Sequence, residues 1–211
     1  MDSKEINFRA GLRRLQVTMT DEQVHNCMRF ASLLLRWNAT YNLTAIRQDQ
    51  EVITHHLLDS VAVDPVLNRY LSHAHSLLDV GSGGGLPVIP LSILHPNMQI
   101  HAVDTVKKKT SFLTQVGIEL CLKNFVAHHA RVQNLKGQYD VISSRAFASL
   151  KDFVEWTEHL LGVNGRWFAM KGVYPEKEIA ELPAFVEVRH CIRLTVPDLD
   201  EERHILILKR K

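Results

Sequence analysis

Residues 79–87 read Asp-Val-Gly-Ser-Gly-Gly-Gly-Leu-Pro, and the first two of them end the short, largely apolar run of residues 77–80. Four glycines stand among the five positions from Gly81 to Gly85, ahead of a stretch that we expect to be helical. Glycine permits a tight strand-to-helix turn and lets a ligand approach the backbone where a Cβ atom would collide. Asp104 ends the next expected strand, about 20 residues further on, where a carboxylate can accept both hydroxyls of a ribose. The stretch therefore predicts a strand-turn-helix unit that binds a nucleotide-type ligand.

Three classes of cofactor loop are candidates for this motif. A dinucleotide fingerprint needs a further glycine where Leu86 stands, and a phosphate-binding P-loop needs a Gly-Lys-Ser/Thr run that the chain lacks. An Asp-x-Gly-x-Gly-x-Gly pattern followed by an acid such as Asp104 is instead typical of S-adenosylmethionine sites. We therefore expect S-adenosylmethionine as the cofactor, with Gly81 and Gly83 under its amino acid end. A glycine-rich turn without a ligand is the alternative.

Strands and helices alternate on the C-terminal side of the motif. We expect strands at residues 77–80, 99–104, 125–127, 139–143 and 166–170, and helices at 107–122 and 150–161, the second stopped by Gly162. Such alternation builds βαβ units around a parallel sheet. Two further strand-like runs, 186–196 and 203–209, indicate an antiparallel edge. The pattern predicts an α/β, Rossmann-like fold with a mostly parallel sheet.

The N-terminal part of the chain has a helical pattern. Thr20 and Gln23 form a capping-box pair ahead of an amphipathic helix of about 18 residues. A second helix is expected from near Asp49, with its apolar residues on one side and Pro65 as its end. We therefore expect residues 1–65 to form a helical segment packed on a core of residues 66–211, as one compact unit.

The composition excludes several classes of protein. The 211-residue chain is 45% hydrophobic and 23% charged, as ordinary globular domains are. No apolar run approaches the roughly 20 residues that span a bilayer, and residues 1–7 do not read as a secretory signal. Three scattered cysteines without C-x-x-C spacing fit a reducing cytoplasm. The formal net charge of +2 means that any nucleic-acid site must be local. The twelve histidines lack the spacing of metal ligands, so we expect no metal.

A resemblance to a known family extends well beyond the glycine loop. Six collinear blocks carry it, at residues 37–44, 56–60, 79–90, 144–150, 170–172 and 196–204. In these blocks the chain resembles the GidB/RsmG family of bacterial 16S ribosomal RNA guanine-N7 methyltransferases. The resemblance implies a class I S-adenosylmethionine-dependent fold with a seven-stranded sheet, and methylation at N7 of a guanine in the 530 loop. It also implies 16S rRNA as partner, within the small ribosomal subunit or an assembly intermediate, and we expect a cytoplasmic monomer.

The resemblance further implies roles for individual residues. Gly81 and Leu86 match backbone contacts around the methionine end of the donor, and Asp104 matches the acid that faces the ribose. Arg145 matches an arginine that lies beside the donor at the carboxyl end of the fourth strand, where ligands collect in open α/β sheets.

The adenine site and two other positions differ from the family pattern. Val132 and Gln133 match the pair that cradles the adenine, but the family usually has an acid where Gln133 stands. It also has an arginine in place of His55 and a glycine in place of Glu201. Because Gln133 can still accept from the adenine amino group, we expect similar or weaker donor binding rather than its loss.

The chemistry expected at guanine N7 needs few reactive side chains. N7 carries a lone pair and no proton, so methyl transfer needs no general base and depends on positioning. Arg145 is the candidate catalytic residue, because its guanidinium can donate to guanine O6 or to the donor carboxylate. Lys171 ends the fifth strand and is also expected to face the cleft. Either side chain could instead form a surface ion pair.

Two other functions remain open from the sequence. Methylation of a ribose 2′-hydroxyl would need a base, for which Lys171 is the obvious candidate. A catalytically silent module could bind the donor or RNA during ribosome assembly.

Contacts with RNA are expected from basic clusters, although charge runs are usually solvated surfaces. The clusters are Arg9 with Arg13 and Arg14, Lys107 to Lys109, and Lys209 to Lys211. In the helical segment, three residues either contact RNA or fasten that segment to the sheet: Asn42, Arg47 and His56.

Overall fold

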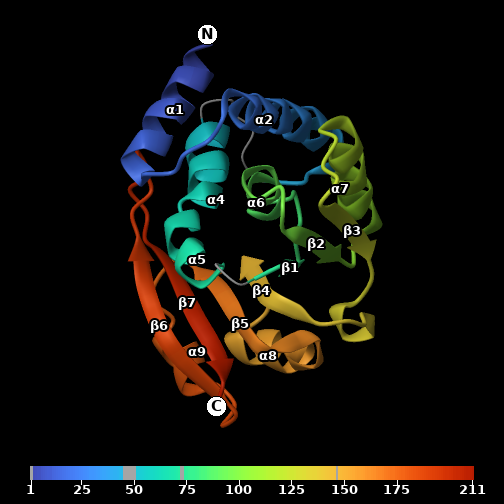
Figure 1. The fold of residues 1–211 in the computed structure, drawn as a ribbon, viewed down its shortest axis with the longest axis vertical. Coiled ribbons are helices and arrows are strands. Elements are labelled where there is room, and N and C mark those ends of the chain that lie inside the picture. Colours follow the sequence, from blue (N-terminus) through green and yellow to red (C-terminus); the bar gives the residue numbers. More distant parts are fainter. Residues whose placement is uncertain (1, 45–50, 72–73, 146) are drawn as a thin grey trace.

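The computed structural model describes residues 2–44, 51–71, 74–145 and 147–211, and a seven-stranded sheet lies at the centre of this part of the chain (Figure 1). Its strands are β1 (Ser76–Val80), β2 (Gln99–Asp104), β3 (Phe125–His129), β4 (Tyr139–Arg145), β5 (Leu161–Lys171), β6 (Val186–Leu194) and β7 (Arg203–Arg210). Their order is β3-β2-β1-β4-β5-β7-β6. Strands β1 to β5 pair in parallel, and β7 runs antiparallel to both β5 and β6. The predicted mostly parallel sheet with an antiparallel edge is confirmed.

The strand order reverses between β1 and β4. From β1 the chain moves outward through β2 to β3, and it then returns to place β4 on the other side of β1. Val80 at the end of β1 lies beside Ser144 near the end of β4. In open α/β sheets, ligands bind outside the carboxyl ends of the strands at such a switch point.

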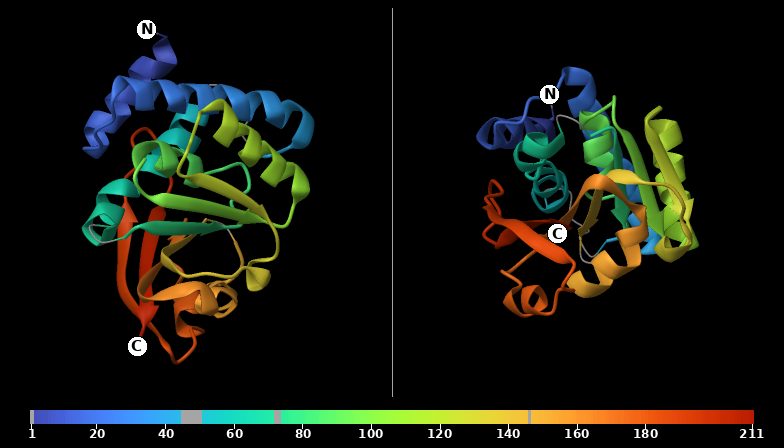
Figure 2. Two further views of the ribbon diagram at one scale, coloured as in Figure 1. Left: turned by 45° about the vertical axis from the view of Figure 1, so that its right-hand side comes forward. Right: turned by 60° about the horizontal axis from the view of Figure 1, so that its bottom comes forward.

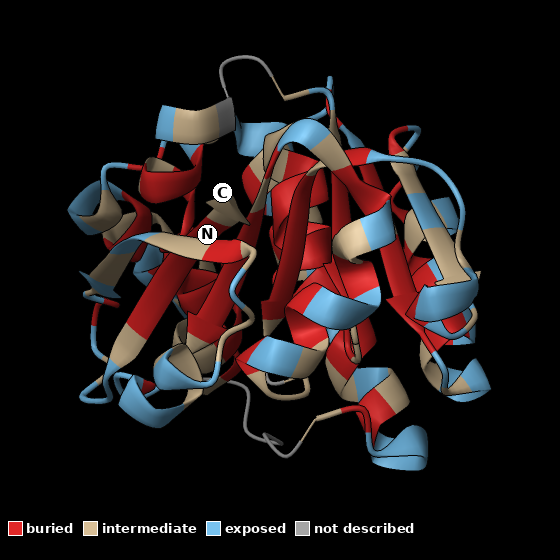
Figure 3. Cartoon of the chain, turned by 90° about the horizontal axis from the view of Figure 1, so that it is seen from below, coloured by how far each residue is buried: buried red, intermediate tan, exposed pale blue. Residues whose placement is uncertain are grey.

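Helices cover both faces of the sheet (Figure 2). Helices α1 (Ser3–Leu15), α2 (Asp21–Tyr41), α6 (Val88–Leu94) and α7 (Lys107–Glu119) lie on one face, where Phe30 and Phe112 are fully buried. On the other face α8 (Leu150–Thr157) covers Trp167, which is also fully buried, and α9 (Glu176–Ala180) lies beside α8. The central strands β1, β4 and β7 are accordingly mostly buried, the edge strands β3 and β6 are largely intermediate or exposed, and the outer helix surfaces are exposed (Figure 3). Within the described ranges, each helix is too short or too polar to cross a membrane.

The N-terminal capping box forms as predicted. The Thr20 hydroxyl accepts from the Gln23 N–H at 3.2 Å, and the Gln23 side chain accepts from the Thr20 N–H at 2.9 Å. Helix α2 then extends over 21 residues, somewhat further than expected. Its buried face packs with α6 and α7, and its Leu34 and Phe30 side chains lie beside Gly84 and Gly85, so the helical segment adjoins the glycine loop.

The second helical region differs from the prediction at its end. Its expected start at Asp49 lies outside the described residues. The described part is a π-helical stretch η1 (Val52–Leu58) that runs into α4 (Asp59–Val61), and α5 (Asp64–Leu71) follows. The prediction that Pro65 ends the helix was wrong, because Pro65 lies in the first turn of α5, where its missing N–H costs nothing.

The prediction that Gly162 stops a helix was also wrong. Helix α8 ends at Thr157, a short 3-10 turn follows, and β5 begins at Leu161. Leu161 pairs with Tyr139 in β4, and a Cβ atom at Gly162 would lie 3.1 Å from the Tyr139 carbonyl oxygen. The glycine therefore permits close strand pairing rather than ending a helix. Helix α7 likewise ends at Glu119, earlier than the expected residue 122.

Candidate active site

The glycine loop leaves β1 at the carboxyl edge of the sheet. Gly81, Gly83 and Gly85 have φ angles of 71°, 54° and 86°, values that residues with a side chain rarely adopt. A Cβ atom at Gly81 would lie 2.7 Å from the Phe147 ring, whereas one at Gly83 would meet only the Gly81 carbonyl oxygen, at 3.8 Å. The backbone at Gly83 therefore faces open space, where a ligand can approach it.

Asp104 ties this loop to the end of β2. Its side chain is 7% exposed, and its Oδ2 accepts from the Gly83 N–H at 3.0 Å while Oδ1 accepts from the Val106 N–H at 2.8 Å. The Lys109 ammonium lies 3.8 Å from Oδ2. Because a carboxylate has about four lone-pair sites, both oxygens can accept a further hydrogen bond. Two ribose hydroxyls would use those sites.

A cavity of about 470 Å³ opens beside this carboxylate, and we call it the Asp104 cavity. Its lining includes Gly81, Asp104, Val132, Gln133, Phe147 and Trp156. The rings of Phe147 and Trp156 meet edge to face, with their centroids 5.7 Å apart. A concave site with apolar and aromatic walls and one fixed carboxylate suits a nucleoside.

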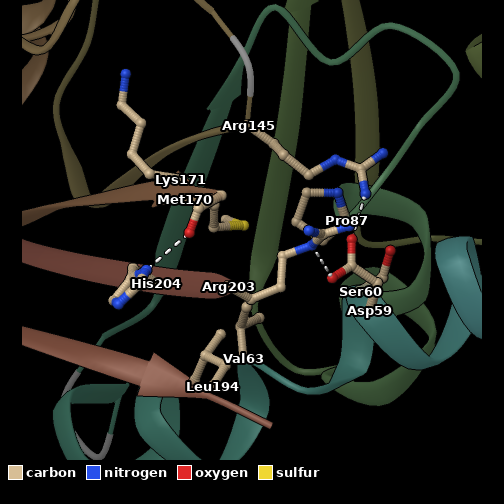
Figure 4. A pocket seen from close by; sticks show the side chains of 11 residues that line it. Asp59, Ser60, Val63, Pro87, Arg145, Met170, Lys171, Leu194, Arg203 and His204 are labelled. Carbon is tan, nitrogen blue, oxygen red and sulfur yellow. Dashed lines mark hydrogen bonds and ion pairs between the residues drawn. The ribbon is translucent and has the colours of Figure 1, made fainter. Parts of the chain in front are cut away.

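A second cavity, of about 340 Å³, lies on the other side of the glycine loop, and we call it the Asp59 cavity (Figure 4). Its lining includes Asp59, Ser60, Pro87, Arg145, Met170, Arg203 and His204. Gly81 and Phe147 line the Asp104 cavity, whereas Pro87 and Arg145 line the Asp59 cavity. The glycine loop and the end of β4 therefore separate two adjoining cavities.

Asp59 joins two arginines from distant strands. The Arg145 Nη1 group donates to Oδ2 at 2.9 Å, and the Arg203 Nε group donates to Oδ1 at 2.9 Å (Figure 4). The neighbouring Ser60 is 1% exposed, and its hydroxyl has no hydrogen-bond partner among the described residues. The cavity therefore offers cationic donors and an unpaired hydroxyl to a polar ligand.

Lys171 lines the Asp59 cavity, as its place at the end of β5 predicts, but its ammonium group is bound outside the Asp59 cluster. Its ammonium group donates to both carboxylate oxygens of Glu178, at 2.9 and 2.8 Å. In Figure 4 the side chain extends away from Asp59 and Arg145. The ion-pair alternative for Lys171 is thus the one that the structure supports.

Two buried titratable groups lie near the site. Burial raises the pKa of Asp79 to about 6, although the Ser143 hydroxyl donates to its carboxylate at 2.7 Å. Burial lowers the pKa of His56 to about 4, partly offset by its hydrogen bond to the His55 carbonyl. Since that carbonyl can only accept, Nδ1 of His56 carries the proton and Nε2 accepts from the Thr44 hydroxyl at 2.8 Å. The neutral His56 ring therefore links Thr44 to η1 within the helical segment.

The departures from the family pattern have distinct places. Gln133 is exposed and lines the Asp104 cavity. His55 and Glu201 lie together, with His55 Nε2 3.8 Å from Glu201 Oε1. The other Glu201 oxygen accepts from the Arg203 Nη2 group at 2.8 Å. Two of the three departures therefore meet at the arginine that also holds Asp59.

The structure separates the residues predicted for the donor. Four of them line the Asp104 cavity: Gly81, Asp104, Val132 and Gln133. Gly83 donates to Asp104, and Leu86 is 5% exposed within the loop. Arg145 ends β4 as expected, but it lines the Asp59 cavity.

Sequence reasoning gave no role to Asp59 or Arg203. Asp59 had a local signal, because it is a carboxylate in the largely apolar helical stretch 57–63 and must be paired if buried. Arg203 had no local signal beyond its place in the family block 196–204, since an arginine at the start of a strand is ordinary. Only the sheet topology brings β4 and β7 to the same helix.

The basic clusters are only partly paired with acids, since no ion pair within the described residues involves Arg13, Lys107, Lys108 or Lys211. Ion pairs with carboxylates are formed by Arg9, Arg14, Lys109, Lys209 and Arg210. Asn42 caps α2 with a left-handed φ of 49°, and Arg47 lies outside the described residues. Within the described residues, no three His, Cys, Asp or Glu side chains gather as a metal site requires.

Solved structures share this architecture at low sequence identity. Magnesium protoporphyrin IX methyltransferase from Synechocystis PCC 6803, solved with bound S-adenosylmethionine, matches with a TM-score of 0.61 and 15% identity. That match covers 92% of this chain and 99% of the other. TrmN from Thermus thermophilus matches with a TM-score of 0.58 and 17% identity, over 75% of this chain and 53% of the other. These likenesses show the class I methyltransferase fold.

Comparisons of sequence identify the family to which the chain belongs. The chain is 56% identical over 183 residues to ribosomal RNA small subunit methyltransferase G of Azoarcus sp. (strain BH72), covering 86% of this chain and 84% of the relative. It is 46% identical to the same-named protein of Neisseria gonorrhoeae, over the full length of both. The family model GidB, described as rRNA small subunit methyltransferase G, matches residues 23–206. The chain therefore belongs to the GidB family of S-adenosylmethionine-dependent methyltransferases.

Proposed function

We propose that this chain transfers a methyl group from S-adenosylmethionine to N7 of a guanine in the 530 loop of 16S ribosomal RNA. The observation that carries the proposal is the pair of adjoining cavities, one suited to a nucleoside donor and one cationic, on either side of the glycine loop. The relatives named as ribosomal RNA small subunit methyltransferases support the RNA substrate.

The Asp104 cavity would hold the donor. Asp104 would accept from the two ribose hydroxyls with the lone pairs that Gly83 and Val106 leave free. Val132 and Gln133 would border the adenine, and the methionine end would pass over Gly81 toward the neighbouring cavity. S-adenosylmethionine, when bound, supplies an electrophilic methyl group on its sulfonium.

The Asp59 cavity would hold the acceptor guanine. Arg145 would donate to guanine O6, with N7 left unbonded so that its lone pair can accept the methyl group. The Ser60 hydroxyl, without a partner among the described residues, would offer a further hydrogen bond. Since N7 carries no proton, these residues act by holding the base in line with the methyl group.

The position of the Lys171 side chain argues against a 2′-hydroxyl acceptor. A general base must lie within hydrogen-bond reach of the proton that it takes, and the Lys171 Nζ group is instead bound to both carboxylate oxygens of Glu178. N7 transfer needs no such base, so it agrees with the geometry.

The target would be structured RNA, within the small subunit or an assembly intermediate, and the protein would act as a monomer. The formal net charge is only +2, and Arg9, Arg14 and Lys209 are ion-paired, so non-specific attraction to RNA would be modest. A splayed guanine entering a shaped cavity would then supply much of the specificity.

A transfer assay tests the proposal. Protein and labelled S-adenosylmethionine are incubated with small subunits that lack the modification, or with naked 16S rRNA, and the RNA is digested to nucleosides. Label in N7-methylguanosine is the expected result, and the better substrate shows when in assembly the protein acts. Measurable donor binding with no transfer to either RNA would contradict the proposed acceptor.

A further inference from the structure

Asp59 occupies the centre of a chain of charged groups at the acceptor side of the site. We infer that Asp59 is a positioning residue, which holds Arg145 in the orientation that the acceptor guanine requires. The inference rests on the proposed function. It concerns a residue that takes no part in the chemistry and acts only through the guanidinium bound to it.

Arg203 fixes Asp59 from one side. Its Nε group donates to Asp59 Oδ1 at 2.9 Å, its Nη1 group to the Glu202 carbonyl at 2.9 Å and its Nη2 group to Glu201 at 2.8 Å. Three acceptors on three sides leave this guanidinium one orientation. Because Asp59 is also only 7% exposed, its carboxylate is held in place before any ligand arrives.

Arg145 depends on that carboxylate. Among the described residues, Asp59 is the hydrogen-bond partner of its side chain, at 2.9 Å from Nη1. One hydrogen bond leaves the other N–H groups of the fork for a ligand. In Figure 4 the side chains of Arg145 and Arg203 reach Asp59 from different strands. The carboxylate also separates two positive charges that would otherwise repel each other across the cavity.

Asp59 itself has no direct chemical task. Both of its oxygens accept from guanidinium groups, and a lone pair at guanine N7 requires no base. Its removal would let Arg145 take other rotamers, and a displacement of about 1 Å at a reacting group can lower a rate about 100-fold.

A mutant cycle tests the inference. Methyl transfer to small subunits is measured for wild type, Asp59→Asn, Arg145→Ala and the double variant, together with the donor dissociation constant of each protein. Asp64→Asn is the matched control, because Asp64 has the same 7% side-chain exposure and accepts from Asn68 at 2.8 Å and from His95 at 2.6 Å. It lies in α5, outside both cavities.

We expect Asp59→Asn to lower kcat/KM at least about tenfold when Arg145 is present and less than about twofold in the Arg145→Ala background. Asp64→Asn should lower the melting temperature without such coupling to Arg145. Equal losses from Asp59→Asn in both backgrounds would overturn the inference, since a merely structural carboxylate adds its effect independently.

A conservative variant covers the case in which Asp59→Asn folds poorly. Asp59→Glu keeps the charge, so it should recover at least part of the activity, whereas a packing role would make the longer side chain the more harmful change. Activity of Asp59→Glu below that of Asp59→Asn, at equal folded fraction, would contradict the inference. Failure of the proposed function is distinct, because wild type itself would then methylate no small-subunit RNA.

Discussion

The two cavities are built from the sequence in different ways. The Asp104 cavity is formed mostly by residues 80–133, where the glycine loop, the strand-end acid and the adenine-facing pair follow each other in order, with Phe147 and Trp156 added from beyond β4. The Asp59 cavity instead combines α4, the end of β4 and the start of β7. Asp59 and Arg203, which are hydrogen-bonded there, lie 144 positions apart in the sequence. The proposed donor site is therefore mostly local in the sequence, whereas the proposed acceptor site depends on the completed fold.

Damage to the donor side should give the largest effect. Gly83→Arg places a side chain at a φ of 54° in the open space above the loop, and Asp104→Ala removes the carboxylate that also holds the Gly83 N–H. Each change should weaken donor binding by about 100-fold or more, because Gly83→Arg fills the space of the ligand and Asp104→Ala removes charge-assisted hydrogen bonds. Calorimetry with S-adenosylmethionine measures it, and circular dichroism should show that the fold is kept. Unchanged affinity in both variants would remove the donor from this cavity.

Damage to the acceptor side should separate catalysis from donor binding. Arg145→Ala should lower kcat about 100-fold, because a donor to the reacting base is lost. It should change donor affinity far less than Asp104→Ala does, because Arg145 lines the Asp59 cavity. Steady-state transfer rates and donor titrations on the same preparations measure both quantities. Equal losses of donor affinity in Arg145→Ala and Asp104→Ala would place Arg145 at the donor and contradict the assignment of separate donor and acceptor cavities.

The motif carboxylate Asp79 should show a cost in stability. Burial raises its pKa from an ordinary 3.8 to about 6, so the folded state favours the protonated carboxyl. The stability of the fold is therefore highest, as far as Asp79 is concerned, below pH 3.8, and it falls as the pH rises through 6 and the buried group ionises. Asp79→Asn should therefore stabilise the protein at pH 8 by about 3 kcal/mol and hardly at pH 4, since a tenfold change in an acid constant corresponds to about 1.4 kcal/mol. Urea unfolding at the two pH values measures the difference. An equal gain in unfolding free energy at pH 4 and pH 8 would show that ionisation of Asp79 does not destabilise the folded protein.

The smallest effect is expected at Lys171. Lys171→Met breaks the ion pair with Glu178, and transfer to N7 should fall by less than about tenfold, because partly exposed ion pairs contribute little. Single-turnover transfer to small subunits measures it. Complete loss of activity, with label absent from guanine in the wild-type product, would favour a 2′-hydroxyl acceptor and a lysine base.

The sequence predicts the Asp104 cavity better than it predicts the Asp59 cavity. The alternation of strands and helices and the Asp79–Asp104 spacing predict the sheet and the donor side, because period and turn chemistry are local. The helix ends assigned to Pro65 and Gly162 were wrong, since proline is tolerated in a first turn and Gly162 serves strand pairing. The partners of Arg145 could not be predicted, because they depend on which strands meet α4.

The most direct test of the two-cavity account is a crystal structure of the protein with S-adenosylhomocysteine and guanosine 5′-monophosphate. The account predicts the ribose hydroxyls of the donor product on Asp104, its adenine beside Val132 and Gln133, and the guanine in the Asp59 cavity with O6 on Arg145. Adenosine density between Asp59 and Arg203, or a donor ribose away from Asp104, would contradict it.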